Sequence, residues 1–173
     1  RIDTIDTAIA YGDSEECLGT IGTADFKVIS KLPALPSNIK SIESWVRNEV
    51  ASSLSRLQAH TLGGILLHRT EDLGSKQGDV AWNTLEQLKL EGLIQSVGYS
   101  IYDPEELDKV FNDYTPDIVQ APYNVLDRRL DQTGWLEKLY SNSVEIHTRS
   151  VFLQGLLLMD TCKRPAKFNR WSK

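Results

Sequence analysis

Six polar side chains of the kinds that transfer protons or bind a substrate by hydrogen bonds stand at the ends of short apolar runs. They are Asp6, Lys31, His68, Ser100, Gln120 and Ser150. A tyrosine, Tyr11, follows closely after the first of them. Such groups can donate a proton, tune the donor and orient a reacting oxygen. They can act together only where a fold brings the ends of several strands to one place.

Predicted strands and helices alternate along the whole chain. Apolar runs predict strands over residues 1–6, 27–31, 65–68, 94–100, 118–121 and 144–152, and helical spacing predicts helices over 14–21, from 41 onward, 79–91, 107–111 and 131–140. This order, with no change of composition along it, predicts one parallel sheet with right-handed connections. We therefore expect a single domain, a partial barrel, over residues 1–173.

Two helix starts carry capping signals. Asp103 precedes Pro104 and an acid at Glu106, which is the pattern of a capped helix with proline at its first position. Asp13 and Glu16 repeat the spacing. We expect both aspartates to cap the helices that follow them.

A parallel sheet with both faces covered is either an open doubly wound sheet or a closed eight-stranded barrel. In a barrel the polar strand ends meet at one mouth, whereas an open sheet of six strands spreads them along about 25 Å of edge. The glycine pattern G-x-G-x-x-G is also missing after the first strands. The sequence therefore predicts an α/β fold of the (β/α)8, TIM-barrel type.

The segment IDTAIAYGDSE at residues 5–15, with the Leu-Gly pair that follows it, resembles the aldo-keto reductases. In that family an Asp ending a strand, a Tyr five residues later, a Lys ending the next strand and a His ending the one after form a catalytic tetrad. Asp6, Tyr11, Lys31 in ISKL and His68 in LLHR stand at those places. The resemblance implies an NAD(P)H-dependent oxidoreductase that reduces aldehydes or ketones.

The chemistry of carbonyl reduction assigns a role to each of the four. Tyr11 donates the proton, but a free phenol has a pKa near 10 and needs help at neutral pH. A lysine ammonium beside it lowers that pKa, and a buried aspartate keeps the lysine charged and in place. His68 orients the substrate oxygen. Taken singly, His68 is better explained as a structural residue, and Lys31 with Asp6 as a structural ion pair; the four together favour catalysis.

Three further segments resemble the family's cofactor-binding segments. VGYS at 97–100 and VQAPYN at 119–124 imply that Ser100 and Gln120 contact the nicotinamide carboxamide, although Ile101 replaces the family's Asn and Asn124 is as well explained as a loop cap. RSVFLQG at 149–155 places Arg149 where the family usually has an aromatic ring under the nicotinamide. Arg149 either stacks on that ring or pairs with a cofactor phosphate, and Ser150 then offers its hydroxyl to the pyrophosphate.

The resemblance runs from the family's second strand to just past its seventh, so the fold expected is an incomplete barrel without the first and eighth strands. The segment that grips the adenosine phosphate is not covered, and NADP(H), with NAD(H) as the alternative, is implied by the family alone. Two unpaired sheet edges would need cover, for which a second copy of the chain is one candidate. We expect the chain by itself to bind the cofactor weakly or not at all.

Charge and composition disfavour nucleic acids and membranes as partners. The 19 basic and 24 acidic residues are scattered, and the formal net charge of −5 offers no basic surface for nucleic acid or anionic lipid. No apolar run approaches the length of a membrane helix. Two distant cysteines, Cys17 and Cys162, indicate free thiols and a reducing compartment. We therefore expect a cytoplasmic protein, without nucleic-acid or membrane partners, that acts on a small carbonyl substrate.

Two other functions compete with the reductase. One is a catalytically silent barrel that binds a partner or a cofactor as a regulator. The other is a hydrolase that uses Asp6 and Glu71 as its carboxylate pair, which the tyrosine and lysine beside Asp6 disfavour.

Overall fold

The computed structural model describes residues 2–171, and six parallel strands form its sheet. The strands pair in sequence order, each with the next. They are β1 (Thr4–Asp6), β2 (Lys27–Leu32), β3 (Gly64–Leu67), β4 (Val97–Ser100), β5 (Ile118–Pro122) and β6 (Glu145–Arg149). This arrangement confirms the predicted incomplete (β/α)8 barrel.

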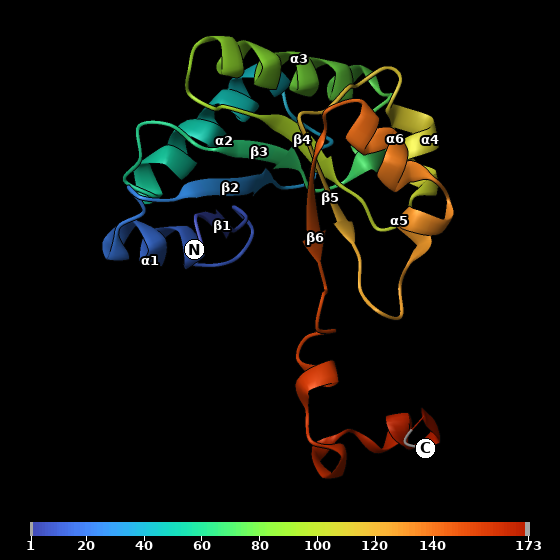
Figure 1. Cartoon of the computed structure of the whole chain (residues 1–173). Coiled ribbons are helices and arrows are strands. Elements are labelled where there is room, and N and C mark those ends of the chain that lie inside the picture. Colours follow the sequence, from blue (N-terminus) through green and yellow to red (C-terminus); the bar gives the residue numbers. More distant parts are fainter. Residues whose placement is uncertain (1, 172–173) are drawn as a thin grey trace.

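Helices follow the strands and lie on the outer face of the sheet (Figure 1). They are α1 (Ser14–Ile21), α2 (Ile42–Arg56), α3 (Lys76–Leu90), α4 (Glu105–Val110), α5 (Arg129–Gln132) and α6 (Trp135–Ser141), with short 3-10 turns η1 (Thr70–Asp72), η2 (Leu156–Leu158), η3 (Thr161–Lys163) and η4 (Ala166–Trp171). The segment after β6 runs away from the sheet, carrying η2 to η4 (Figure 1). No helix within residues 2–171 is long and apolar enough to cross a membrane.

The main core lies between the sheet and the helices. Because successive side chains of a strand point to opposite faces, residues such as Ile65, Leu67 and Val119 face the helices and belong to the same buried cluster as Val46 of α2 and Leu85 of α3. A separate, smaller cluster occupies the concave face of the sheet and consists of Ile29, Leu66 and Ile118. The same alternation therefore builds an outer core and the floor of a barrel interior.

The sheet is curled rather than flat. Lys27, at the start of β2, and Glu145, at the start of β6, form an ion pair with 2.6 Å between Nζ and Oε2. Four strand spacings separate these positions along the sheet, which is about 19 Å when a sheet is flat. Curvature of this degree brings the concave faces of the first and last strands toward each other.

The structure corrects several predicted boundaries. The helix expected over 131–140 is two helices, because Gly134 takes a left-handed φ of +79° between α5 and α6. α3 begins at Lys76, three residues before the expected start, and the Ser75 hydroxyl caps it by accepting from Gly78 N at 3.0 Å. β6 ends at Arg149, so Ser150 lies outside the strand with a φ of +58°.

Of the two predicted caps, one is present. The Glu106 carboxylate accepts from the backbone N–H of Asp103 at 2.8 Å, and Asp103 Oδ1 accepts from Glu105 N at 3.1 Å. Asp13 makes no side-chain cap, because its backbone (φ −89°, ψ 10°) departs from the extended conformation that aims a capping oxygen at the helix.

Candidate active site

Lys31 is the centre of a hydrogen-bonded group at the carboxyl ends of the strands. Its ammonium donates to both Asp6 oxygens, at 2.7 and 2.8 Å, and to the Thr7 carbonyl at 2.7 Å. The lysine side chain is 1% exposed, whereas that of Asp6 is 43% exposed. All three donor positions of the ammonium are thus occupied, which makes burial of the charge tolerable.

The alternation along the strands explains why the polar residues share this place. Lys31, His68 and Gln120 each follow by two residues one of the three apolar residues on the barrel floor. Side chains two residues apart on a strand point to the same face. The three polar side chains therefore stand above the floor, at the mouth of the barrel.

Tyr11 reaches the mouth from the loop between β1 and α1. Its ring lies edge-on to the His68 ring, with centroids 6.0 Å apart and planes at 72°. Lys31 Nζ is 5.5 Å from the centroid of the Tyr11 ring. Tyr11 is 49% exposed, so its phenol is open to a small molecule. The structure thus brings Asp6, Tyr11, Lys31 and His68 together.

The pKa of Tyr11 shifts upward in this structure, opposite to the direction expected from Lys31 alone. The pKa of the phenol lies above its ordinary value, first because the ring is partly buried and then because the Asp6 carboxylate and the Tyr102 phenol lie near it. Lys31 contacts both oxygens of Asp6, and the opposite charge of that carboxylate offsets the effect of the ammonium on the phenol. The Arg149 guanidinium acts in the opposite direction and lowers the Tyr11 pKa.

The other two titratable groups are shifted toward their neutral forms. Burial lowers the pKa of Lys31, against the hydrogen bond to Asp6, which raises it. The pKa of His68 is lowered by burial and then by the charges of Lys31 and Arg149. His68 is therefore neutral at neutral pH and keeps one N–H donor and one acceptor nitrogen.

Ser100 and Gln120 are neighbours in the sheet. Their Cα positions are partners in the β4–β5 register, and both residues are buried. The Gln120 amide Nε2 donates to Asp6 Oδ1 at 2.7 Å, which connects it to the lysine group. The two residues thus present a hydroxyl and an amide side by side, the groups that hydrogen-bond a carboxamide.

Arg149 lies at the same mouth, whereas Ser150 lies outside the group of residues at the mouth. The Arg149 guanidinium stacks on the Tyr102 ring, with Cζ 4.3 Å from the centroid, and donates to the Ile101 carbonyl at 2.9 Å. Ser150 is exposed in the turn after β6. Its carbonyl accepts from the Asn124 amide at 3.2 Å, while the Asn124 carbonyl oxygen accepts from two backbone N–H groups of its own loop. Asn124 is therefore a loop cap.

A polar hollow of about 280 Å³ lies between β1, β5 and β6. It is lined by Thr4, Asp6, Gln120, His147, Thr148 and Arg149. An amide, two hydroxyls and a flat guanidinium are suitable partners for a planar ring that carries a carboxamide. The described residues at the mouth thus fit the nicotinamide end of a dinucleotide.

Sequence reasoning missed Thr7 and His147. Thr7 supplies the carbonyl that completes the coordination of the Lys31 ammonium, and no side-chain pattern reports a backbone contact. His147 stands two residues before Arg149 on β6, so the period of two would have placed both on the concave face. The His147 ring is bonded to Glu145 at 2.7 Å.

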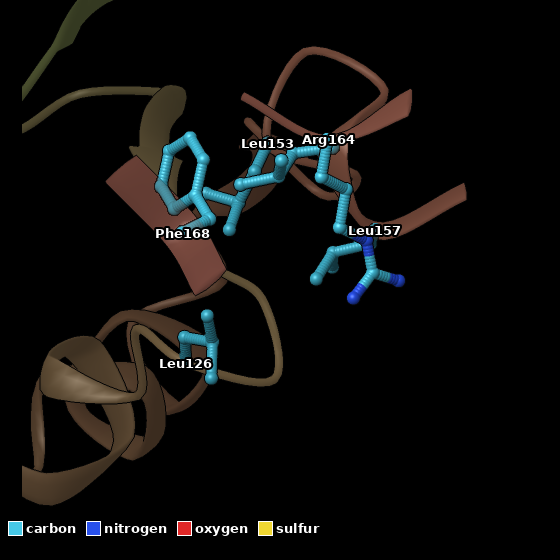
Figure 2. Close-up of a pocket in the computed structure, with 6 residues that line it drawn as sticks. Leu126, Leu153, Leu157, Arg164 and Phe168 are labelled. Atoms are coloured by element: carbon cyan, nitrogen blue, oxygen red, sulfur yellow. The ribbon is translucent and has the colours of Figure 1, made fainter. Parts of the chain in front are cut away.

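A second hollow, of about 370 Å³, is apolar and lies away from these groups. In Figure 2, Leu126 comes from the loop after β5, and Leu153, Leu157, Arg164 and Phe168 come from the segment after β6. Arg164 donates to the Met159 carbonyl at 3.1 Å. The lining lacks the acid–base groups found at the barrel mouth.

Comparison with solved structures finds the same fold in aldo-keto reductases. One from Bacillus halodurans, in its holo form, superposes with a TM-score of 0.76 at 24% identity, over 95% of this chain and 56% of that one. A putative aldo-keto reductase from Pseudomonas aeruginosa gives 0.68 at 27% identity, over 85% and 59%. One from Klebsiella pneumoniae, solved in complex with NADPH, gives 0.73 at 22% identity, over 98% and 60%.

The chain spans under two thirds of the length of these proteins. Among curated sequences no significant match was found. The sequence profile of the aldo/keto reductase family, however, matches residues 2–172. Because that match extends over nearly all of the sequence, the chain belongs to the aldo-keto reductase family.

Proposed function

We propose that this chain is an NAD(P)H-dependent reductase that converts aldehydes or ketones to alcohols, with Tyr11 as the proton donor. The observation that carries the proposal is the convergence of Tyr11, His68 and the Lys31–Asp6 pair at one open mouth. NADPH is the proposed cofactor, with NADH as the alternative, and a relative of the same fold is described as a complex with NADPH.

A reduced nicotinamide, when bound, supplies the hydride. Ser100 and Gln120 would hold its carboxamide, and Arg149 would lie against the ring or a phosphate. His68, neutral at neutral pH, donates its N–H to the carbonyl oxygen and orients it. The chain's own residues thus fix the acceptor carbon relative to the donor.

Tyr11 completes the reaction by giving its phenolic proton to the oxygen as negative charge develops there. Its raised pKa keeps the phenol protonated at neutral pH, so the proton is always present for transfer. An alkoxide is a stronger base than a phenolate, so the transfer remains favourable. Lys31 would stabilise the phenolate left behind, while Asp6 holds the Lys31 ammonium in place and the Thr7 carbonyl ties that ammonium to the surrounding loop.

The experiment compares wild type with Tyr11→Phe in NADPH and NADH oxidation over a panel of aldehydes. We expect turnover to fall by about 10²- to 10⁴-fold, the usual contribution of a general acid. Tyr140→Phe is the matched control, because Tyr140 is 81% exposed and lies on α6, a helix on the outer face of the sheet. Equal turnover in wild type and Tyr11→Phe would contradict the assignment, and a folded wild type without turnover would favour a silent, cofactor-binding barrel.

A further inference from the structure

The position of Tyr11 depends on the loop that joins β1 to α1. Tyr11 is 49% exposed, so the packing around its ring is limited. Its backbone, in contrast, is bound on both sides: the N–H donates to the Ala8 carbonyl at 3.0 Å, and the carbonyl accepts from the Ser14 N–H at 3.1 Å. These bonds close two successive turns that share Tyr11. The phenol therefore keeps its place at the mouth only while the two turns keep their shape.

The start of this loop is bound to β2. The Ile9 N–H donates to the Lys31 carbonyl at 3.2 Å. Thr7, which precedes the first turn, donates its N–H to the Ile29 carbonyl at 2.9 Å, and its own carbonyl accepts from Lys31 Nζ at 2.7 Å. Thr7 is also 1% exposed. The backbone of the first loop residues is thus fixed to the strand that carries the buried lysine.

The far end of the loop is anchored as well. Ser14 is the first residue of α1, and the next residue, Glu15, is 2% exposed. The Glu15 carboxylate accepts from the Ser30 hydroxyl on β2 at 2.6 Å and from the Ser53 hydroxyl on α2 at 2.7 Å. The first turn of α1 is therefore held beside the sheet.

A pair of hydroxyl groups joins the two ends. Thr7 Oγ1 and Ser14 Oγ share a hydrogen bond of 3.0 Å, which closes the loop between them. Because the Thr7 carbonyl also binds the Lys31 ammonium, one residue connects the buried charge to the start of α1. Tyr11 lies within the closed loop, with its ring centroid 5.5 Å from Lys31 Nζ and 6.0 Å from that of His68. Loss of the hydroxyl pair would leave the two turns free to move relative to these groups.

We propose that Thr7 is a positioning residue whose hydroxyl, paired with that of Ser14, holds Tyr11 in place for proton transfer. The proposal deepens the proposed reductase function and rests on it for the role of Tyr11, whereas the closure of the loop does not depend on it. Misplacement of a reacting group by about 1 Å lowers a rate by up to about 100-fold. An open loop should therefore affect the chemical step more than the binding of the cofactor.

The first measurement compares the kinetics of aldehyde reduction by NADPH in the full chain. Thr7→Val keeps the shape of the side chain but removes the hydroxyl, and we expect kcat to fall by about 10- to 100-fold with the KM for NADPH unchanged. Thr7→Ser keeps the hydroxyl and should restore most of kcat. Ser14→Ala removes the same bond from its less buried end. It should match Thr7→Val, and the double variant should be no slower than either single variant.

Thr84→Val is the matched control. Thr84 is 2% exposed, and its hydroxyl donates to the Val80 carbonyl at 2.6 Å within α3, on the outer face of the sheet. This variant also removes the hydrogen bond of a buried threonine hydroxyl, but away from the mouth, so kcat should not change. An equal fall of kcat in Thr84→Val would trace the loss to general destabilisation and overturn the proposal.

The second measurement does not depend on turnover. The rings of Tyr11 and His68 meet edge to face, so NMR spectra at neutral pH should show a nuclear Overhauser effect between their ring protons in wild type. We expect this signal to be lost in Thr7→Val and Ser14→Ala, and to be retained in Thr7→Ser and in Thr84→Val. Its absence from a folded wild type would contradict the placement of Tyr11 and overturn the proposal.

The two measurements together separate the hydroxyl pair from the reductase. In an active wild type, equal kcat in Thr7→Val would overturn the proposal and leave the reductase standing. A fall of kcat with the ring signal retained would place the effect of Thr7 elsewhere than on Tyr11 and would equally overturn it. A folded wild type without turnover would contradict the reductase, and the ring signal alone would then decide whether the hydroxyl pair holds Tyr11.

Discussion

Gln120, on β5, donates its side-chain amide to the Asp6 carboxylate on β1, with 2.7 Å between Nε2 and Oδ1. The two strands are four positions apart in the sheet, a separation of about 19 Å if the sheet were flat. The bond exists because the sheet curls, and it joins Gln120 to the Lys31–Asp6 pair. The curvature of the sheet is thus what brings the residues of the candidate site together.

Removing Asp6 should lower the free energy of unfolding more than removing Lys31. Asp6→Asn leaves an ammonium that is 1% exposed with its charge unmatched, so we expect the free energy of unfolding to fall by about 3 kcal/mol or more. Lys31→Met leaves a carboxylate that is 43% exposed and solvated, and should cost about 1 kcal/mol. Urea unfolding of the three proteins measures both losses; equal losses would mean that burial of the lysine does not dominate the pair.

We expect Glu15, which lies outside the candidate active site, to contribute strongly to the free energy of unfolding. Its carboxylate, 2% exposed, accepts from the Ser30 and Ser53 hydroxyls at 2.6 and 2.7 Å and from Arg56, and so ties α1 to β2 and α2. Glu15→Ala should lower the free energy of unfolding by about 3 kcal/mol, because it leaves these donors without their acceptor. The exposed Glu16 of the same helix gives the control, and Glu16→Ala should change stability by less than about 0.5 kcal/mol.

Gly98 allows β4 and β5 to approach closely beside Ser100 and Gln120, so we expect a side chain at this position to destabilise the fold. A Cβ at Gly98 would lie 1.8 Å from the Ile118 carbonyl oxygen, a backbone atom that cannot turn aside. We expect Gly98→Ala to destabilise by about 3 kcal/mol, at the upper end of overpacking costs. Gly134→Ala meets no neighbour within 4 Å and bears only the left-handed backbone cost, about 1 kcal/mol. Thermal unfolding ranks the two, and the reverse order would contradict the close approach.

The convergence of strand ends in a barrel was enough to predict which polar residues meet, with one exception. It placed six residues at one mouth; the structure brings Asp6, Lys31, His68, Ser100 and Gln120 there, whereas Ser150 lies exposed in the turn after β6. The failures in the helices were local: Gly134 interrupts an apolar pattern that continues across it, Asp13 does not have the backbone conformation of a cap, and α3 begins three residues before its expected start.

The electrostatics of the site could not be predicted in the same way. Whether Lys31 acts on Tyr11 depends on how fully Asp6 takes up its charge, and that follows from distances between strands far apart in the sequence. The contacts of Arg149 with Ile101 and Tyr102 likewise depend on the approach of β6 to the loop after β4, which no pattern in the sequence reports.

His68 should make the stability of the protein depend on pH. Its pKa in the folded protein is lowered from the ordinary 6.5, first by burial and then by the charges of Lys31 and Arg149. The folded state therefore binds fewer protons than the unfolded state, so the stability that neutral His68 contributes is present above pH 6.5 and is lost as the pH falls through the lower folded pKa. NMR titration of the ring should show a pKa below 6.5 that moves up in Arg149→Gln, because one of the opposing charges is removed.

The same shift should appear in activity. Because the proposed reduction uses the neutral imidazole, the acid limb of kcat/KM should lie below pH 6.5 in wild type and move toward 6.5 in Arg149→Gln. The exposed His60 serves as the internal reference in the NMR spectra of both proteins. A His68 pKa above 6.5 would mean that the Asp6 carboxylate, which favours the imidazolium, outweighs burial and both cations. An unchanged pKa in Arg149→Gln would instead place the guanidinium too far from His68 to act on it.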